Sequence, residues 1–137
     1  MVLYGACMAS GEGYGEFPLR SFLGMDVASD AEGRARATLE VAEQHLNPNG
    51  VVHGAVLFAL LDTAMGAAAL SVLPDGEFAT SVDLQLRFVR PASAGSLVAD
   101  VDVLKRGRNV IHLEGRIEEA SSRLIATASG TFARFTV

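Results

Sequence analysis

One apolar segment in the middle of the 137-residue chain constrains its fold more than any other feature. The run GAVLFALLDTAMGAAALSV, residues 54–72, contains no proline and a single charged residue, Asp62. The run predicts a helix whose apolar residues are distributed over all of its sides. Such a helix is expected either to be buried on all sides or to cross a membrane. The length just reaches the roughly 18 residues that a membrane span requires.

The surroundings of this helix favour burial in a soluble protein. A carboxylate such as Asp62 costs about 2.5–3.5 kcal/mol at the centre of a bilayer, even on the lenient scale. Many of the other residues are small alanines or glycines, and strand-like segments lie on both sides of the run. We therefore predict a central helix wrapped by a sheet.

The flanking segments alternate apolar and polar residues with the period of two that is typical of half-buried strands. In the third of them, alternation places Thr80 on the apolar face and Ser81 on the polar face. Short polar links between successive strands predict an antiparallel sheet. The class is α+β in the order β-β-α-β-β-β-β. The predicted strands are residues 24–29, 34–41, 78–90, 97–105, 109–119 and 124–135, after a short helical turn at 18–23.

Composition and charge exclude several classes of function. The net charge of −5 and the pI near 5.1 argue against general affinity for nucleic acid or anionic membranes. The lone cysteine, Cys7, allows no internal disulfide and no cysteine-cluster metal site, and it has no nearby cation to make it a nucleophile. The three histidines lack metal-ligand spacing, so neither a metal nor a cofactor is predicted. His45 and His112 are expected to be ordinary surface residues.

The N-terminal residues predict a loose leader rather than a targeting signal. Residues 1–16 hold four glycines and few candidates for the core, so they are expected to be flexible. They carry no basic n-region and no apolar stretch long enough for secretion, which predicts a cytoplasmic location. Residues 17–137 are expected to form one domain.

Two residues of the predicted central helix are candidates for a catalytic role. Gly54 opens the helix, so its N–H is a first-turn donor without an intrahelical partner, suited to a carbonyl oxygen that becomes an oxyanion. Asp62 is costly in an apolar helix unless it is paired, so it serves either as a structural hydrogen-bonding group or as a catalytic base or nucleophile. Eight residues separate the two by ~12 Å along the axis. A shared reaction centre therefore requires two subunits with antiparallel helices.

The pattern N-x5-HG-x7-D, formed here by residues 47, 53, 54 and 62, resembles the hotdog-fold acyl-CoA thioesterases, and especially the PaaI-type branch associated with phenylacetate degradation. LGMDV, SVDLQLRFVRP, KRGRNV and SGTFARF agree in the same order, from about Phe17 to the C-terminus. The resemblance implies a six-stranded antiparallel sheet around one long helix. It also implies dimers joined edge to edge, and often a dimer of dimers, which is a homotetramer.

The resemblance also implies roles for individual residues. Asp62 would be the general base or nucleophile, and the Gly54 N–H would bind the thioester oxygen. Asn47 would orient the water or the acyl carbonyl, and Ser81 would help to place the water. His53 would either support catalysis or simply brace the turn.

The family commonly has two glycines after the histidine, whereas here the second is Ala55. Alanine keeps its N–H, so an oxyanion donor is expected to survive at this position. The added methyl group puts the substrate range in doubt more than the activity.

The chain has one dense basic cluster, formed by Lys105, Arg106 and Arg108 around a predicted turn. Three cations in this position could bind the phosphates of coenzyme A, which would be part of the substrate and product rather than a cofactor. The alternative is a solvated hairpin tip.

The sequence leaves three hypotheses about function open, and it favours the first of them. Hydrolysis of an acyl-CoA, with an aryl or medium-chain acyl group, is preferred. A non-catalytic acyl-CoA sensor on the same fold has little use for the Asp62 carboxylate. A 2-enoyl-thioester hydratase is expected to carry a different arrangement of His and Asp. Ala59, Ala64 and Met65 are predicted to line the acyl pocket.

Overall fold

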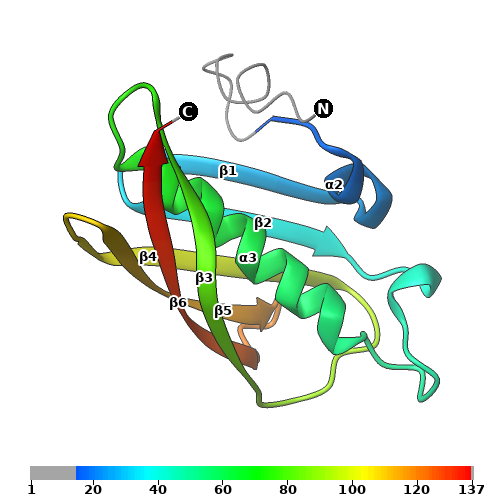
Figure 1. Cartoon of the computed structure of the whole chain (residues 1–137). Coiled ribbons are helices and arrows are strands. Elements are labelled where there is room, and N and C mark those ends of the chain that lie inside the picture. Colours follow the sequence, from blue (N-terminus) through cyan, green and yellow to red (C-terminus); the bar gives the residue numbers. More distant parts are fainter. Residues whose placement is uncertain (1–14, 137) are drawn as a thin grey trace.

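The structure, a computed structural model, describes residues 15–136 (Figure 1). Each predicted strand and helix is present, with ends shifted by no more than two residues. Cys7 and all but the last two residues of the predicted leader lie outside the described residues. The elements in chain order are α2 (Pro18–Leu23), β1 (Met25–Ala31), β2 (Arg34–Glu40), the 3-10 helix η1 (Glu43–His45), α3 (Gly54–Ser71), β3 (Glu77–Phe88), β4 (Ser96–Arg106), β5 (Val110–Glu119) and β6 (Leu124–Thr136).

The strands form one antiparallel sheet that curls around α3 (Figure 1). Their order is β1-β2-β4-β5-β6-β3, so β1 and β3 are the edge strands. Leu60, Leu61 and Met65 of α3 have no exposed surface. The predicted α+β class, with a six-stranded antiparallel sheet around one central helix, is confirmed.

Two glycines in the sheet allow α3 to approach it closely. A Cβ on Gly115 of β5 would lie 2.9 Å from a methyl group of Leu61 and 2.9 Å from a methyl group of Val101. A Cβ on Gly130 of β6 would lie 2.5 Å from the sulfur of Met65. Side chains of α3 therefore occupy the space that residues with a Cβ would need, and this close packing fixes the height of the helix above the sheet.

The choice between a buried helix and a membrane span is decided by the packing. By length and composition α3 could cross a membrane, but 61% of it is buried within the fold. An apolar helix surrounded by protein needs no lipid to cover it. The chain is a soluble fold, as the small residues and Asp62 predicted.

A β-bulge in β3 corrects the predicted orientation of Ser81. The register with β6 shifts between Ser81 and Asp83, which leaves Val82 as the extra residue. Ala79 and Leu84 both pack against the core, although an odd spacing would place them on opposite faces of a regular strand. The extra residue therefore puts Ser81 on the same face as Ala79, toward α3. Strict alternation was wrong here because it assumes an unbroken ladder.

Candidate active site

The first turn of α3 has one unused backbone donor. His53 precedes the helix with φ −62° and ψ 137°, and its Nδ1 accepts the Ala55 N–H at 2.9 Å. The Val56 N–H is donated to the His53 carbonyl at 2.9 Å. Within residues 15–136 the Gly54 N–H makes no hydrogen bond. It is the donor available to a ligand at the positive end of the helix dipole.

These contacts bear on two expectations from the sequence. Of the two roles left open for His53, the observed contact is the one that braces the turn, because its side chain caps the helix. The Ala55 N–H does not survive as an oxyanion donor, since it is already donated to His53. Because His53 holds the Ala55 N–H, Gly54 is the open donor of this turn within residues 15–136.

Asn47 shapes the loop that leads into α3. Its Oδ1 accepts the Asn49 N–H at 2.9 Å and the Val51 N–H at 3.3 Å, and its own N–H is donated to the Val51 carbonyl at 2.7 Å. In the described part of the chain the Asn47 amide NH₂ makes no hydrogen bond. The carbonyl of the side chain is therefore structural, and the NH₂ is the part that can contact water or substrate.

His45 is buried, contrary to the prediction that it is an ordinary surface residue. It is only 2% exposed, because η1 turns it inward beneath the end of α2. Its Nδ1 accepts the Ala42 N–H at 2.9 Å, so its Nε2 carries the proton and donates to the Leu23 carbonyl at 2.8 Å. Its own carbonyl accepts the His53 N–H at 2.8 Å. His45 thus joins α2 to the loop that positions α3.

Replacing His45 by alanine is expected to destabilise the protein by roughly 1–3 kcal/mol, since it removes the partners of the part-buried Ala42 N–H and the buried Leu23 carbonyl. Urea unfolding measures the change. His112→Ala is the matched control, because His112 is exposed on β5 and should shift the free energy of unfolding by no more than about 0.5 kcal/mol. Equal unfolding midpoints for the two variants would contradict the structural role of His45.

Asp62 lies halfway along α3 and is partly buried. Burial raises the pKa of its carboxyl above the ordinary value, and a hydrogen bond from the Ser81 side chain acts in the opposite direction. Ser81 lies on the side of β3 that faces α3 because the bulge turns it inward. A carboxylate held in a poorly solvated place with a hydroxyl beside it is a candidate general base.

The raised pKa of Asp62 predicts that catalysis and stability conflict at this position. Between the unfolded and folded pKa values the folded chain binds more protons than the unfolded chain, so stability falls as pH rises through this window. Asp62→Asn should therefore have a higher Tm than the wild type at pH 7, with the gap narrowing toward pH 4. Thermal unfolding at a series of pH values tests this, and a lower Tm at pH 7 would contradict it.

The uncovered side of α3 carries both Gly54 and Asp62. Phe58, four residues from each, lies on the same side and is 41% exposed. Ala64 and Met65, predicted to line the acyl pocket, instead have no exposed surface and face the core, whereas Ala59 is partly exposed. The buried positions of α3 are Val56, Leu57, Leu60, Leu61 and residues 63–69.

This side of α3 lies beside the edge strand β3, whose end contacts the helix start. The Phe88 ring lies 3.2 Å from the position that a Cβ on Gly54 would occupy. Phe88 is nevertheless 57% exposed, and Val82 and Val89 are 64% and 44% exposed. An apolar strand edge with unpaired backbone groups readily pairs with another strand. The candidate site is thus at a surface that this chain alone leaves open.

The basic cluster lies at the other end of α3. Arg106 donates through Nη1 to the Val72 carbonyl at 2.8 Å, so it caps the C-terminus of the helix. Arg134 donates to the Gly107 carbonyl at 2.9 Å and holds the turn in place. Lys105 and Arg108 are exposed. Within one chain these cations are not brought to Gly54, since 18 helical residues span ~27 Å.

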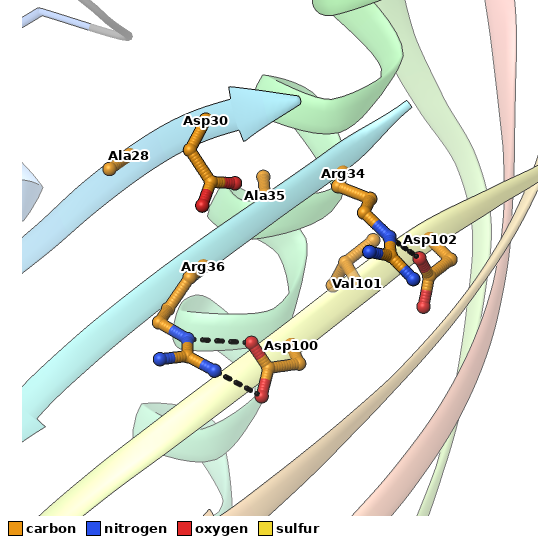
Figure 2. Close-up of a pocket in the computed structure, with 8 residues that line it drawn as sticks. All are labelled: Ala28, Asp30, Arg34, Ala35, Arg36, Asp100, Val101 and Asp102. Carbon is orange, nitrogen blue, oxygen red and sulfur yellow. Dashed lines mark hydrogen bonds and ion pairs between the residues drawn. The ribbon is translucent and has the colours of Figure 1, made fainter. Parts of the chain in front are cut away.

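A pocket of about 400 Å³ lies elsewhere, over β1, β2 and β4 (Figure 2). Its arginines are paired: Arg34 with Asp102 at 2.9 Å, and Arg36 with Asp100 at 2.7 Å. Ala35 and Val101, which lie between these residues along β2 and β4, turn inward to the core, so the ion pairs lie on the outer face of the sheet. None of the predicted site residues lines this pocket. Its lining is Ala28, Asp30, Arg34, Ala35, Arg36, Asp100, Val101 and Asp102.

Fold and site together define a class of protein. An antiparallel sheet curled around one long helix is a hotdog fold. Its partly buried carboxylate and open helix N–H are the groups that attack on a polarised carbonyl requires. Residues 49–126 match the Thioesterase superfamily. The chain belongs to this family, as a thioester hydrolase of the PaaI type.

Individual relatives agree with this membership. Acyl-coenzyme A thioesterase PaaI of Escherichia coli is 33% identical over 79% of this chain and 76% of its own. The solved structure of E. coli PaaI covers 85% of this chain and 83% of that one, with 31% identity and a TM-score of 0.79. The 1,4-dihydroxy-2-naphthoyl-CoA hydrolase of Listeria monocytogenes is 27% identical over 84% of this chain and 94% of its own.

A conserved protein of Pseudomonas aeruginosa has a structure with a TM-score of 0.84 and 28% identity, covering 88% of this chain and 95% of that one. For some other esterases that match, the chain spans just under two thirds of their length, 64–66%.

Proposed function

We propose that the protein hydrolyses an acyl-CoA to the free acid and coenzyme A, with an aryl or medium-chain acyl group. The observation that carries this proposal is the partly buried Asp62 carboxyl, whose pKa is raised by burial, on the same side of α3 as the unused Gly54 N–H. The names of the relatives support a CoA thioester. E. coli PaaI comes from a phenylacetic acid degradation operon, so phenylacetyl-CoA is the first aryl thioester to test.

In the proposed reaction the thioester oxygen accepts the Gly54 N–H, and the helix dipole stabilises the negative charge that develops on it. Asp62 takes a proton from a water molecule whose oxygen bonds to the thioester carbon. The tetrahedral intermediate then expels the CoA thiolate as the C–S bond breaks, and the proton passes to the sulfur. Alternatively, the carboxylate itself attacks and a mixed anhydride is hydrolysed. Asn47 and Ser81 orient the water.

We infer that the complete site lies between two subunits. Gly54 and Asp62 of one chain are separated by ~12 Å along the helix, too far to act on one carbonyl carbon. A second copy placed with its helix antiparallel brings its Asp62 to this Gly54 and yields two equivalent sites. The apolar edge of β3 next to the site supports such pairing. A dimer completes the site, and a homotetramer formed as a dimer of dimers contains the same pair.

The exposed cations of the basic turn fit the phosphates of coenzyme A. Lys105 and Arg108 point into solvent, and the turn is held by the bonds from Arg106 to α3 and from Arg134 to Gly107. In the antiparallel pair, this end of α3 lies toward the helix start of the other subunit. We therefore propose that Lys105 and Arg108 bind the phosphates while Arg106 positions the turn. Neither a metal nor a cofactor is needed, and a cytoplasmic location matches an acyl-CoA substrate.

Release of free thiol from a panel of aryl- and alkyl-CoA thioesters tests the proposal. Turnover of saturated thioesters is expected, with one acyl class preferred. Binding without turnover would contradict it in favour of a sensor. Conversion of 2-enoyl thioesters to 3-hydroxyacyl thioesters without release of thiol would contradict it in favour of a hydratase.

A further inference from the structure

Phe58 is a large apolar residue of α3 whose side chain the fold does not bury. It is 41% exposed, whereas its neighbours Leu57 and Leu60 are 5% and 0% exposed. Residues 54, 58 and 62 are spaced four apart, so they follow one another along a single side of the helix. Phe58 therefore lies midway between the two groups of the proposed reaction, ~6 Å along the axis from each.

The proposed site determines where Phe58 lies in the dimer, so the following inference depends on that site. A two-fold axis that brings Gly54 of one chain level with Asp62 of the other exchanges these two positions. The position halfway between them, residue 58, is then opposite the same position of the partner subunit. Phe58 therefore faces Phe58 of the partner subunit across the axis.

We propose that the two Phe58 rings meet on the two-fold axis and form a shared wall that closes both acyl pockets. The direction of the acyl group follows from the other end of the site. On its Cβ side Gly54 is covered by the Phe88 ring, which lies 3.2 Å from the position that a Gly54 Cβ would occupy. An acyl group bonded to the carbonyl therefore extends toward the axis and ends against the aromatic pair, which offers a flat apolar surface.

Phe58→Ala tests the wall through the acyl preference. Removing both rings should raise kcat/KM for long acyl groups relative to short ones by about 10-fold or more. Phe22→Ala is the matched control, because Phe22 is 72% exposed on α2, which lies against β1 at the sheet edge opposite β3, and its removal should leave the ratio unchanged. An active Phe58→Ala enzyme with the wild-type ratio would overturn the specificity role of Phe58.

A cross-link tests the position of Phe58 without relying on activity. In a Cys7→Ser background the chain has no other cysteine, so Phe58→Cys adds the single thiol. A short bis-maleimide should join two Phe58→Cys chains into a covalent dimer, while Phe22→Cys should remain monomeric on a denaturing gel. An active enzyme in which position 58 does not cross-link would overturn this placement alone. A wild type that releases no thiol from any thioester would instead contradict the proposed function.

Discussion

Asp62→Asn is expected to lower kcat/KM for the best thioester by ~100-fold or more, because the amide cannot accept a proton from water. The change keeps the size of the side chain and its contact with Ser81, so the fold should be retained. Free-thiol release measures the loss. Asp30→Asn is the matched control, since Asp30 is exposed on the outer face of the sheet. Equal activity of wild type and Asp62→Asn would refute catalysis by this carboxylate.

The pH profile provides a second measurement on the same carboxylate. Only the ionised form of Asp62 can act as base or nucleophile, so kcat/KM should rise with pH through its pKa. Because burial raises this pKa, the acidic limb should lie above the ordinary value of 3.8. The limb should be absent from the residual activity of Asp62→Asn. A limb that persists unchanged in the variant would assign it to another group.

Gly54→Pro is expected to reduce kcat by ~10²–10³-fold, because proline has no N–H to donate to the oxyanion. The backbone should accept the change. Proline is favoured at the first position of a helix, and His53 already has the extended conformation that a residue before proline requires. Thiol release under saturating substrate measures kcat.

Gly54→Ala separates the missing N–H from the added side chain. Both variants place a Cβ where the nearest atoms belong to the Phe88 ring, at 3.2 and 3.3 Å. This ring is largely exposed and can shift by a few tenths of an ångström, so Gly54→Ala should lose much less activity than Gly54→Pro. Equal losses in the two variants would attribute the effect to crowding rather than to the hydrogen bond.

Mixed dimers test whether the site is shared between subunits. A heterodimer of one Gly54→Pro chain and one Asp62→Asn chain has one site with both defects and one with neither, if each site takes Gly54 from one chain and Asp62 from the other. Heterodimers purified through two different tags should then recover about half of the wild-type activity. If each site belonged to one chain, every site would carry a defect and no activity would return.

Much of the fold could be predicted from the sequence because hydrophobic periodicity states which faces are buried. The apolar run after Gly54 and the alternating segments around it predicted the helix, the six strands and the antiparallel sheet. Asp62 stood out because a carboxylate in an apolar helix is energetically costly unless it is paired or has a catalytic role. Gly54 stood out because the first helical turn always leaves donors unpaired.

Tertiary contacts decided the rest of the site. Whether Ser81 faces Asp62 depended on a bulge, which arises from pairing with β6 and has no marker in the alternation. His45 can be buried because a carbonyl 22 residues away accepts a hydrogen bond from its Nε2. The positions of Phe58 and Phe88 likewise depend on how far the sheet covers α3.

The sequence by itself determined the class of the fold and the two main chemical groups of the site, since both follow from local patterns of polarity and from the geometry of one helix. Only the tertiary structure decided which backbone N–H is unused, which side of α3 is uncovered and which side chains border it. These properties depend on contacts between segments far apart in the chain, and such contacts form only when the sheet closes around the helix.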